Sequence, residues 1–183
     1  MTLVLDDAVD ICPGCGVVQA AGDWIASGRG NASAGCEVLL SEITGYESQH
    51  PELARCHQLT VDAYGAQHAG GGTKQIRVAY SLVGLYLALD RGISGIGVRT
   101  AHSLMGKPRP DWPVFDRPAS PGTVTVRDVA EAGARADSVP GHAAAVTRWA
   151  VAVWGSFAGC RADVVALTER LFSGAEPFWR GTS

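Results

Sequence analysis

The sequence predicts a mainly α protein: a compact helical bundle with an N-terminal zinc-knuckle-like loop and a Pro-rich loop packed across the bundle. Helical patterns follow one another from the mid-thirties onwards, two cysteines share one tight turn before them, and a proline-dense stretch interrupts them. At 183 residues the chain fits one domain with a proper core. We divide this single domain (1–183) into a metal-binding loop segment (1–33), a helical body (34–172) and a tail (173–183).

Composition narrows the class of partner. The chain is 46% hydrophobic and 18% charged, with a net charge of -3. No basic surface is indicated, so we expect neither nucleic acid nor a membrane as partner. The N-terminus lacks the features of a signal peptide and the longest apolar stretch, 78–89, is too short to span a bilayer, so we expect a cytoplasmic protein. In a reducing compartment, five cysteines favour metal binding or redox chemistry over disulfides.

The turn Cys12-Pro13-Gly14-Cys15-Gly16 has the composition of a zinc knuckle. Proline and glycine let backbone amides point back at the two sulfurs, and two thiolates supply half of a tetrahedral shell. A redox dithiol uses the same spacing, but it normally precedes a helix, whereas Gly16-Val17-Val18 follow here. We therefore favour zinc, with redox-active or incidental thiols as the alternative.

A third thiol lies at the start of the first predicted helix. Ser33 is suited to cap a helix over 34–43, with Cys36 in its first turn. A thiol in that position is biased towards thiolate, so Cys36 is a candidate third ligand. The alternative is a small buried hydrophobic residue.

The next predicted helix begins near Pro51 and ends before Gly70. His57 and His68 share one face of it but lie eleven residues, about 16 Å, apart. They cannot bind one ion, so the helix carries either two sites, one at each end, or histidines held in the core. The fourth zinc ligand is either His57 or Cys56, giving the set Cys12, Cys15, Cys36 and His57 or an all-thiolate set.

The remaining elements follow from apolar spacing, caps and breakers. Further helices are expected over 73–90, 94–105, 126–136 and 140–171, the last bent at Gly155 and Gly159. The first of these is apolar around nearly its whole circumference, which predicts that it is central and buried. Five prolines between 106 and 121 exclude a helix there, while Trp112 and Phe115 indicate a loop that packs on the body.

Taken together, these residues resemble a bacterial family catalogued as domain of unknown function 5946. The resemblance is carried by Cys12-Pro13-Gly14-Cys15-Gly16, Gly35-Cys36, 57–64 with Gln67-His68, 89–92, Trp112-Pro113, 124–129 and 149–154. It implies no activity, and it favours His57 over Cys56 as ligand. It also implies a second, histidine-rich metal site in relatives, built from His68 and from positions that hold Ser81 and Cys160-Arg161 here. Three alternatives follow for this chain. Cys160 could replace a histidine as a thiolate ligand, the pocket could work without metal, or the residues at these positions could be structural.

Two kinds of function remain open. The first is an enzyme acting on a small molecule, with a structural zinc at one end of the 51–68 helix and a catalytic pocket at the other. His68 would act as acid or base and Cys160 as nucleophile, beside Asp62 and Tyr64; Asp62 could instead brace a neighbouring element and Tyr64 could be core. The second is a non-catalytic, zinc-stabilised binding or regulatory module, with a Cys12–Cys15 redox sensor as a third alternative. No phosphate-binding glycine motif, GxSxG elbow or HExxH pair points to a reaction.

Overall fold

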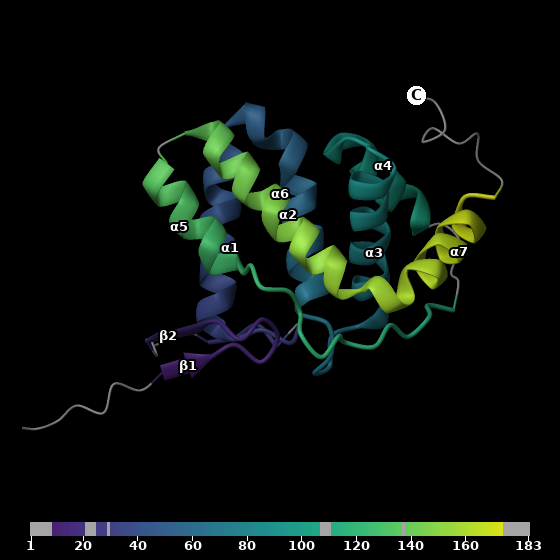
Figure 1. The fold of residues 1–183 in the computed structure, drawn as a ribbon, viewed down its shortest axis with the longest axis horizontal. Helices are drawn as coiled ribbons and strands as arrows, with labels where there is room; N and C mark the ends of the chain where they lie inside the picture. The colour runs from purple at the N-terminus through teal and green to yellow at the C-terminus, as the bar shows by residue number, and fades with distance from the viewer. Residues whose placement is uncertain (1–8, 21–24, 29, 107–110, 137, 174–183) are drawn as a thin grey trace, which may run out of the picture.

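The computed structural model describes residues 9–20, 25–28, 30–106, 111–136 and 138–173. Within these ranges the protein is mainly α, as predicted, with a single two-stranded hairpin (Figure 1). The helices are α1 (Ala34–Gln49), α2 (Ala54–Gln67), α3 (Gln75–Leu85), α4 (Gly95–Met105), α5 (Val126–Ala136), α6 (Val139–Ser156) and α7 (Arg161–Leu171). The expected tail beyond Ser173, and Pro108 and Pro110, lie outside the described residues.

Helix α2 lies at the middle of the bundle and packs against α1, α3, α4 and α6 (Figure 1). A 3-10 turn over Pro51–Leu53 leads into it, since proline lacks only an amide that would be unpaired at a helix start. Gly70, Gly71 and Gly72 follow it with φ of 89°, 51° and 89°, a region that glycine adopts without strain. The chain therefore reverses directly after His68.

The core is built where α3 and α6 meet α2. Trp149 of α6 is fully buried, and its Nε1 donates to Gln67 Oε1 of α2 at 2.9 Å. Leu82 and Leu85 of α3 are equally buried, which confirms the prediction of a central, apolar helix. Each such side chain contributes about 1.5–3 kcal/mol through burial. This core fixes the position of the C-terminal end of α2, where Gln67 lies.

A hairpin precedes the helices, where the sequence analysis expected only a loop. Strands β1 (Val9–Ile11) and β2 (Val18–Ala20) pair antiparallel, with Ile11 opposite Val18. Three residues are too few to display the alternation that marks a strand. The hairpin matters because it holds the Cys12–Cys15 turn at its tip.

The proline-rich loop packs across the bundle, as predicted. Phe115 is buried and its amide donates to Gln75 Oε1 at 3.4 Å, while the ring of Trp112 lies 5.3 Å from that of Tyr80. Arg117 Nη2 donates to the carbonyl of Gly14 at 2.7 Å. The loop thus ties the hairpin to the helical body, along the lower edge of the view in Figure 1.

The C-terminal helix is divided, contrary to the prediction of one long helix from Pro140. α6 begins after a Ser138 cap and ends at Ser156, and α7 leaves at 63° to it after a 3-10 turn over Ala158–Cys160. Gly155 is still within α6 and Gly159 lies in the 3-10 turn, so both flank the break without forming it. The break falls at Phe157, a buried side chain whose amide bonds back to Trp154 and Gly155.

Among the described residues, no single helix has the length and apolar content to cross a bilayer. The α6–α7 pair reaches them jointly, but only as two segments bent by 63°.

Candidate metal centre

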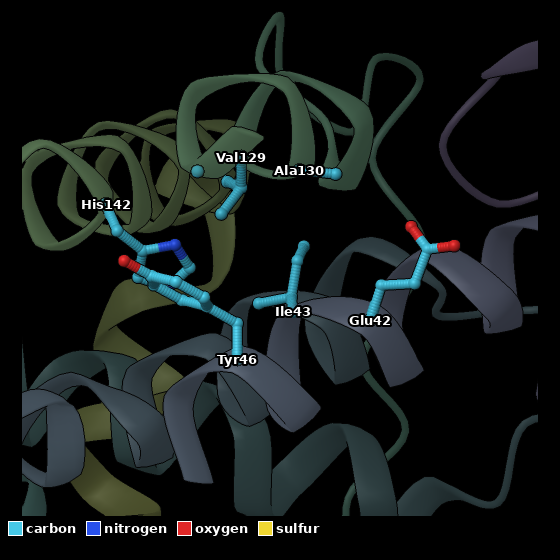
Figure 2. A pocket seen from close by; sticks show the side chains of 7 residues that line it. Glu42, Ile43, Tyr46, Val129, Ala130 and His142 are labelled. Atoms are coloured by element: carbon cyan, nitrogen blue, oxygen red, sulfur yellow. The ribbon is translucent and has the colours of Figure 1, made fainter. Parts of the chain in front are cut away.

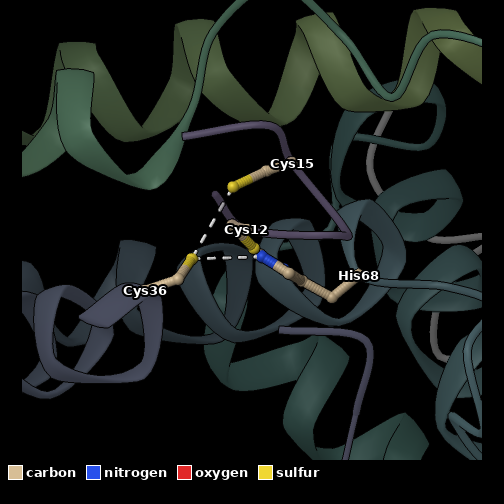
Figure 3. Close-up of side chains that lie close together, drawn as sticks. All are labelled: Cys12, Cys15, Cys36 and His68. Carbon is tan, nitrogen blue, oxygen red and sulfur yellow. Dashed lines mark hydrogen bonds between the residues drawn. The ribbon is translucent and has the colours of Figure 1, made fainter. Parts of the chain in front are cut away.

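The first two cysteines are positioned by the backbone of the hairpin tip. The amide of Cys12 donates to Val17 O at 2.9 Å, and the amide of Gly16 donates to Cys12 O at 2.8 Å. Gly16 takes a φ of 78°, which suits glycine and lets the chain turn. Cys12 and Cys15 therefore point to the same side of the turn, into the bundle (Figure 3).

Cys36 comes from the first turn of α1. Ser33 caps this helix, with its hydroxyl accepting from the Cys36 amide at 3.3 Å, as predicted. The Cys36 side chain is fully buried, and its sulfur lies 3.6 Å from that of Cys15. The cap thus fixes the thiol against the hairpin tip.

The fourth group is His68, which caps the C-terminal end of α2. Its Nδ1 lies 2.7 Å from the carbonyl of Tyr64, a contact that makes Nδ1 the donor and turns Nε2 towards the sulfurs. His68 Nε2 is 3.2 Å from Cys36 Sγ. The ligand atoms of Cys12, Cys15, Cys36 and His68 all lie within 4.8 Å of one another, and all four residues are buried (Figure 3). This arrangement could hold a metal ion.

The pKa of each of the three thiols depends on its hydrogen bonds to the other two. Hydrogen bonds from Cys15 and then Cys36 lower the pKa of the Cys12 thiol, whereas the hydrogen bond to Cys12 raises the pKa of Cys15 to about 11. The pKa of Cys36 is raised, first by its hydrogen bond to Cys12. One thiolate is thus stabilised by two neighbouring thiols. A bound cation would allow all three sulfurs to be thiolates.

The fourth position therefore differs from the predicted one. His57 does not join the cysteines: its Nδ1 lies 2.7 Å from Glu47 Oε2, near the other end of α2. Cys56 is not in the cluster either, since its thiol donates to Leu53 O at 3.2 Å. The reason is the placement of the hairpin, because Asn31 Nδ2 donates both to Pro13 O at 3.4 Å and to Ala69 O at 3.1 Å.

One residue of the sequence, Gly14, is compatible with His68 as the fourth ligand. A Cβ on Gly14 would collide with Cδ2 of the His68 ring, so only glycine in the Cys-Pro-Gly-Cys turn leaves space for that imidazole. The glycine predicted a tight turn. Its second role needs the partner segment and could not be read from spacing.

The four residues predicted as catalytic have separate surroundings. The Tyr64 ring packs 4.0 Å from that of His68, beside the metal cluster, and burial raises the pKa of its hydroxyl. Asp62 is buried, and a Cβ on Gly84 of α3 would collide with its Oδ2. The thiol of Cys160 donates to Phe157 O at 3.3 Å in the α6–α7 turn. Only Tyr64 and His68 contact each other.

Asp62 is a carboxyl in an apolar setting. Burial raises its pKa well above the usual value, while its one hydrogen bond, from Gln58 Nε2 at 3.1 Å, opposes the rise. Its Oδ2 has no hydrogen-bond partner. The Asp62 residue also lines a cavity of about 230 Å³ between α2 and α4. A carboxyl in this position is favoured in its neutral form.

A second polar cluster, which the sequence analysis did not anticipate, surrounds Glu47 of α1. Its side chain is fully buried, with Thr60 donating to Oε1 at 2.5 Å, His57 Nδ1 at 2.7 Å from Oε2 and His142 Nε2 at 3.1 Å from Oε1. The ligand-type atoms of Glu47, Cys56 and His142 also lie within 4.8 Å of one another. Glu47 and His142 are 95 residues apart in the chain, so no local spacing could pair them.

Comparison with known proteins identifies a family but no characterised relative. The chain belongs to a family of unknown function, DUF5946, whose profile matches residues 10–158. The matched part contains both polar clusters and ends before Cys160. No curated protein and no solved structure matches the chain.

Proposed function

We propose that the protein is a zinc-stabilised helical module, in which Cys12, Cys15, Cys36 and His68 bind one structural zinc ion. The observation that carries this proposal is the convergence of four buried ligand atoms within 4.8 Å of one another. A single bound cation would satisfy all four groups at once, whereas without it each buried thiol and imidazole needs a hydrogen-bond partner of its own.

The ligand set supports zinc. Thiolates and imidazole are the donors zinc prefers, and a tetrahedral ion would place neighbouring sulfurs about 3.8 Å apart and a sulfur about 3.6 Å from the nitrogen. The corresponding separations are 3.6 Å for Cys15 and Cys36, and 3.2 Å for Cys36 and His68. Small movements would bring the four atoms into a zinc shell.

A structural role follows from the number of ligands. Four protein ligands fill a tetrahedral shell and leave no position for a substrate or an activated water. The ion would join the hairpin tip, the start of α1 and the end of α2, three segments that are distant from one another in the sequence. Its binding free energy would therefore contribute to folding directly.

Cobalt(II) substitution tests both the ligand set and its closure. We expect one Co²⁺ per chain, with the visible bands of a tetrahedral site and the sulfur-to-cobalt charge transfer of three thiolates. Azide should leave this spectrum unchanged, because no coordination position is open. A weak octahedral spectrum would contradict the site, and a spectrum altered by azide would contradict its structural role.

A thiol redox sensor is the second candidate, favoured by the 3.6 Å separation of the Cys15 and Cys36 sulfurs. In that case mild peroxide would form a disulfide and release the metal, and a reductant would restore both. The burial of all four groups favours the structural role, since redox-sensing thiols are usually accessible.

A further inference from the structure

A cavity lies beside the Glu47 cluster, between α1, α5 and the start of α6 (Figure 2). Its volume is about 310 Å³, which suits a molecule with one aromatic ring. It is lined by Glu42, Ile43, Tyr46, Val129, Ala130, Gly133 and His142. The walls are mainly apolar, so a polar group among them stands out.

That polar group is Nδ1 of His142. The side chain is 1% exposed, and Nδ1 has no hydrogen-bond partner. A Cβ on Gly133, which lines the cavity, would lie 3.3 Å from this nitrogen, so Nδ1 is on the cavity side of the ring. A buried polar atom without a partner is costly, and a ligand in the cavity could satisfy it.

The Glu47 carboxylate determines which nitrogen of the His142 ring carries the proton. It lies 3.1 Å from the other ring nitrogen, Nε2, and a carboxylate accepts hydrogen bonds, which makes Nε2 the protonated nitrogen. The single negative charge of Glu47 is also shared with His57, whose side chain is 38% exposed. With the proton on Nε2, Nδ1 of the neutral imidazole presents a lone pair to the cavity.

We propose that this cavity binds a small, uncharged, largely apolar alcohol or phenol whose hydroxyl donates a hydrogen bond to Nδ1 of His142. Ile43, Val129 and Ala130 would cover its apolar body, and the ring of Tyr46, 5.0 Å from that of His142, would flank the hydroxyl end. An anion would be disfavoured by the carboxylates of Glu42 at the cavity wall and Glu47 behind the imidazole. The site thus selects for a neutral donor.

A metal ion held by Glu47, Cys56 and His142 is the competing use of the same residues. It would take Nε2 of His142, the nitrogen that faces Glu47, instead of Nδ1. Both Glu47 oxygens already have hydrogen-bond partners, and burial together with the Glu47 charge raises the pKa of Cys56 to about 11, which keeps the thiol protonated. The geometry therefore favours the organic ligand, and the two uses engage different nitrogens.

The test is NMR of ¹⁵N-histidine-labelled, metal-loaded full-length protein, titrated with 4-ethylphenol and with 4-ethylanisole. The two probes have similar bodies, but only the phenol has a donor. We expect the free protein to show His142 protonated at Nε2, and the phenol to shift Nδ1. The anisole should bind at least about tenfold more weakly, as expected for one lost hydrogen bond.

Two matched variants complete the test. Gly133→Ala should weaken phenol binding at least about tenfold, because the new methyl group would cover Nδ1 in a helix that otherwise favours alanine. Gly155→Ala in α6, where a Cβ meets nothing within 4 Å, should bind the phenol like the wild type. The proposal is overturned if neither probe shifts His142, if both bind equally, if Gly133→Ala binds as well as Gly155→Ala, or if added Zn²⁺ engages Nε2.

Discussion

The two ends of α2 use similar residues in different ways. At the C-terminal end, His68 meets three cysteines, and all four groups turn towards one point. At the N-terminal end, His57 and His142 meet Glu47, both of whose oxygens have hydrogen-bond partners, but Nδ1 of His142 faces a cavity without a partner. Both clusters are anchored by α1, through Cys36 and Glu47 respectively.

We propose that this difference separates a structural site from a binding site. Where every donor atom converges and is buried, a cation can satisfy all of them, and no group remains for a substrate. Where one buried acceptor is left facing a cavity, a ligand could supply the missing partner.

Cys36→Ser should destabilise the metal-loaded protein far more than Cys56→Ser. The first removes a proposed zinc ligand at the C-terminal end of α2, and we expect the free energy of unfolding to fall by about 3–5 kcal/mol. This is less than the whole metal-binding free energy of a zinc finger, because the helical core remains. The second changes a thiol that only contacts Leu53 O, at a cost of about 1 kcal/mol or less. Urea unfolding of both variants measures the difference; equal losses would remove the contrast.

Glu47→Gln should cost about 2–4 kcal/mol, since it removes the buried charge that accepts hydrogen bonds from Thr60, His57 and His142. Glu42→Gln is the matched control on the same helix, where the side chain is exposed and the expected change is below about 0.5 kcal/mol. Thermal unfolding at fixed pH compares them. Metal content should stay unchanged in both, because the cluster at the other end is intact.

Asp62→Asn should remove a pH dependence of stability that comes from the buried carboxyl of Asp62 in α2. Burial raises the folded-state pKa of Asp62 above 3.8, so the folded protein holds a proton that the unfolded chain releases. The wild type therefore loses stability as pH rises from 3.8 towards the folded-state pKa, and the variant lacks this loss. The stability of the variant relative to the wild type should rise with pH, whereas a difference independent of pH would show that folding does not raise the pKa of Asp62.

Thr60→Val is the mildest probe of the Glu47 cluster. It removes one of three hydrogen bonds to the carboxylate while keeping the side-chain shape, and we expect a loss of about 1–2 kcal/mol. Thr44→Val in α1 is the control, because its hydroxyl bonds only to carbonyls of its own helix and the expected change is below about 0.5 kcal/mol. Denaturant midpoints suffice for the comparison; similar midpoints would indicate that Glu47 is held by the histidines alone.

Much of the fold could be predicted because it depends on local signals. The Ser33 cap is confirmed. The start of α5 also depends on a local contact, in which the amide and hydroxyl of Thr125 both donate to Asp128 Oδ2 at 2.7 Å. The glycine run after α2 and the packed Pro-rich loop are also as expected. These features need only a few neighbouring residues.

The assignment of the histidines could not be predicted, because it depends on long-range packing. The sequence analysis placed the fourth ligand at His57 or Cys56 and His68 in a separate pocket, whereas His68 meets the cysteines in the fold. Hydrogen bonds from Asn31 and Arg117 to the Cys12–Cys15 turn place that turn beside His68. His57 and His68 therefore lie in two different clusters, one near each end of α2, but Asp62 and Cys160 belong to neither. Glu47 and His142 were missed since neither lies in a motif and they meet only when α1 packs against α6.

Metal analysis of His68→Ala beside His57→Ala tests the central claim most directly. Both variants remove an imidazole from the same face of α2, at opposite ends, and both are compared with the wild type after purification without a metal-binding tag. We predict about one zinc per chain in the wild type and in His57→Ala, and markedly less in His68→Ala. Loss of zinc in His57→Ala with retention in His68→Ala would contradict the account.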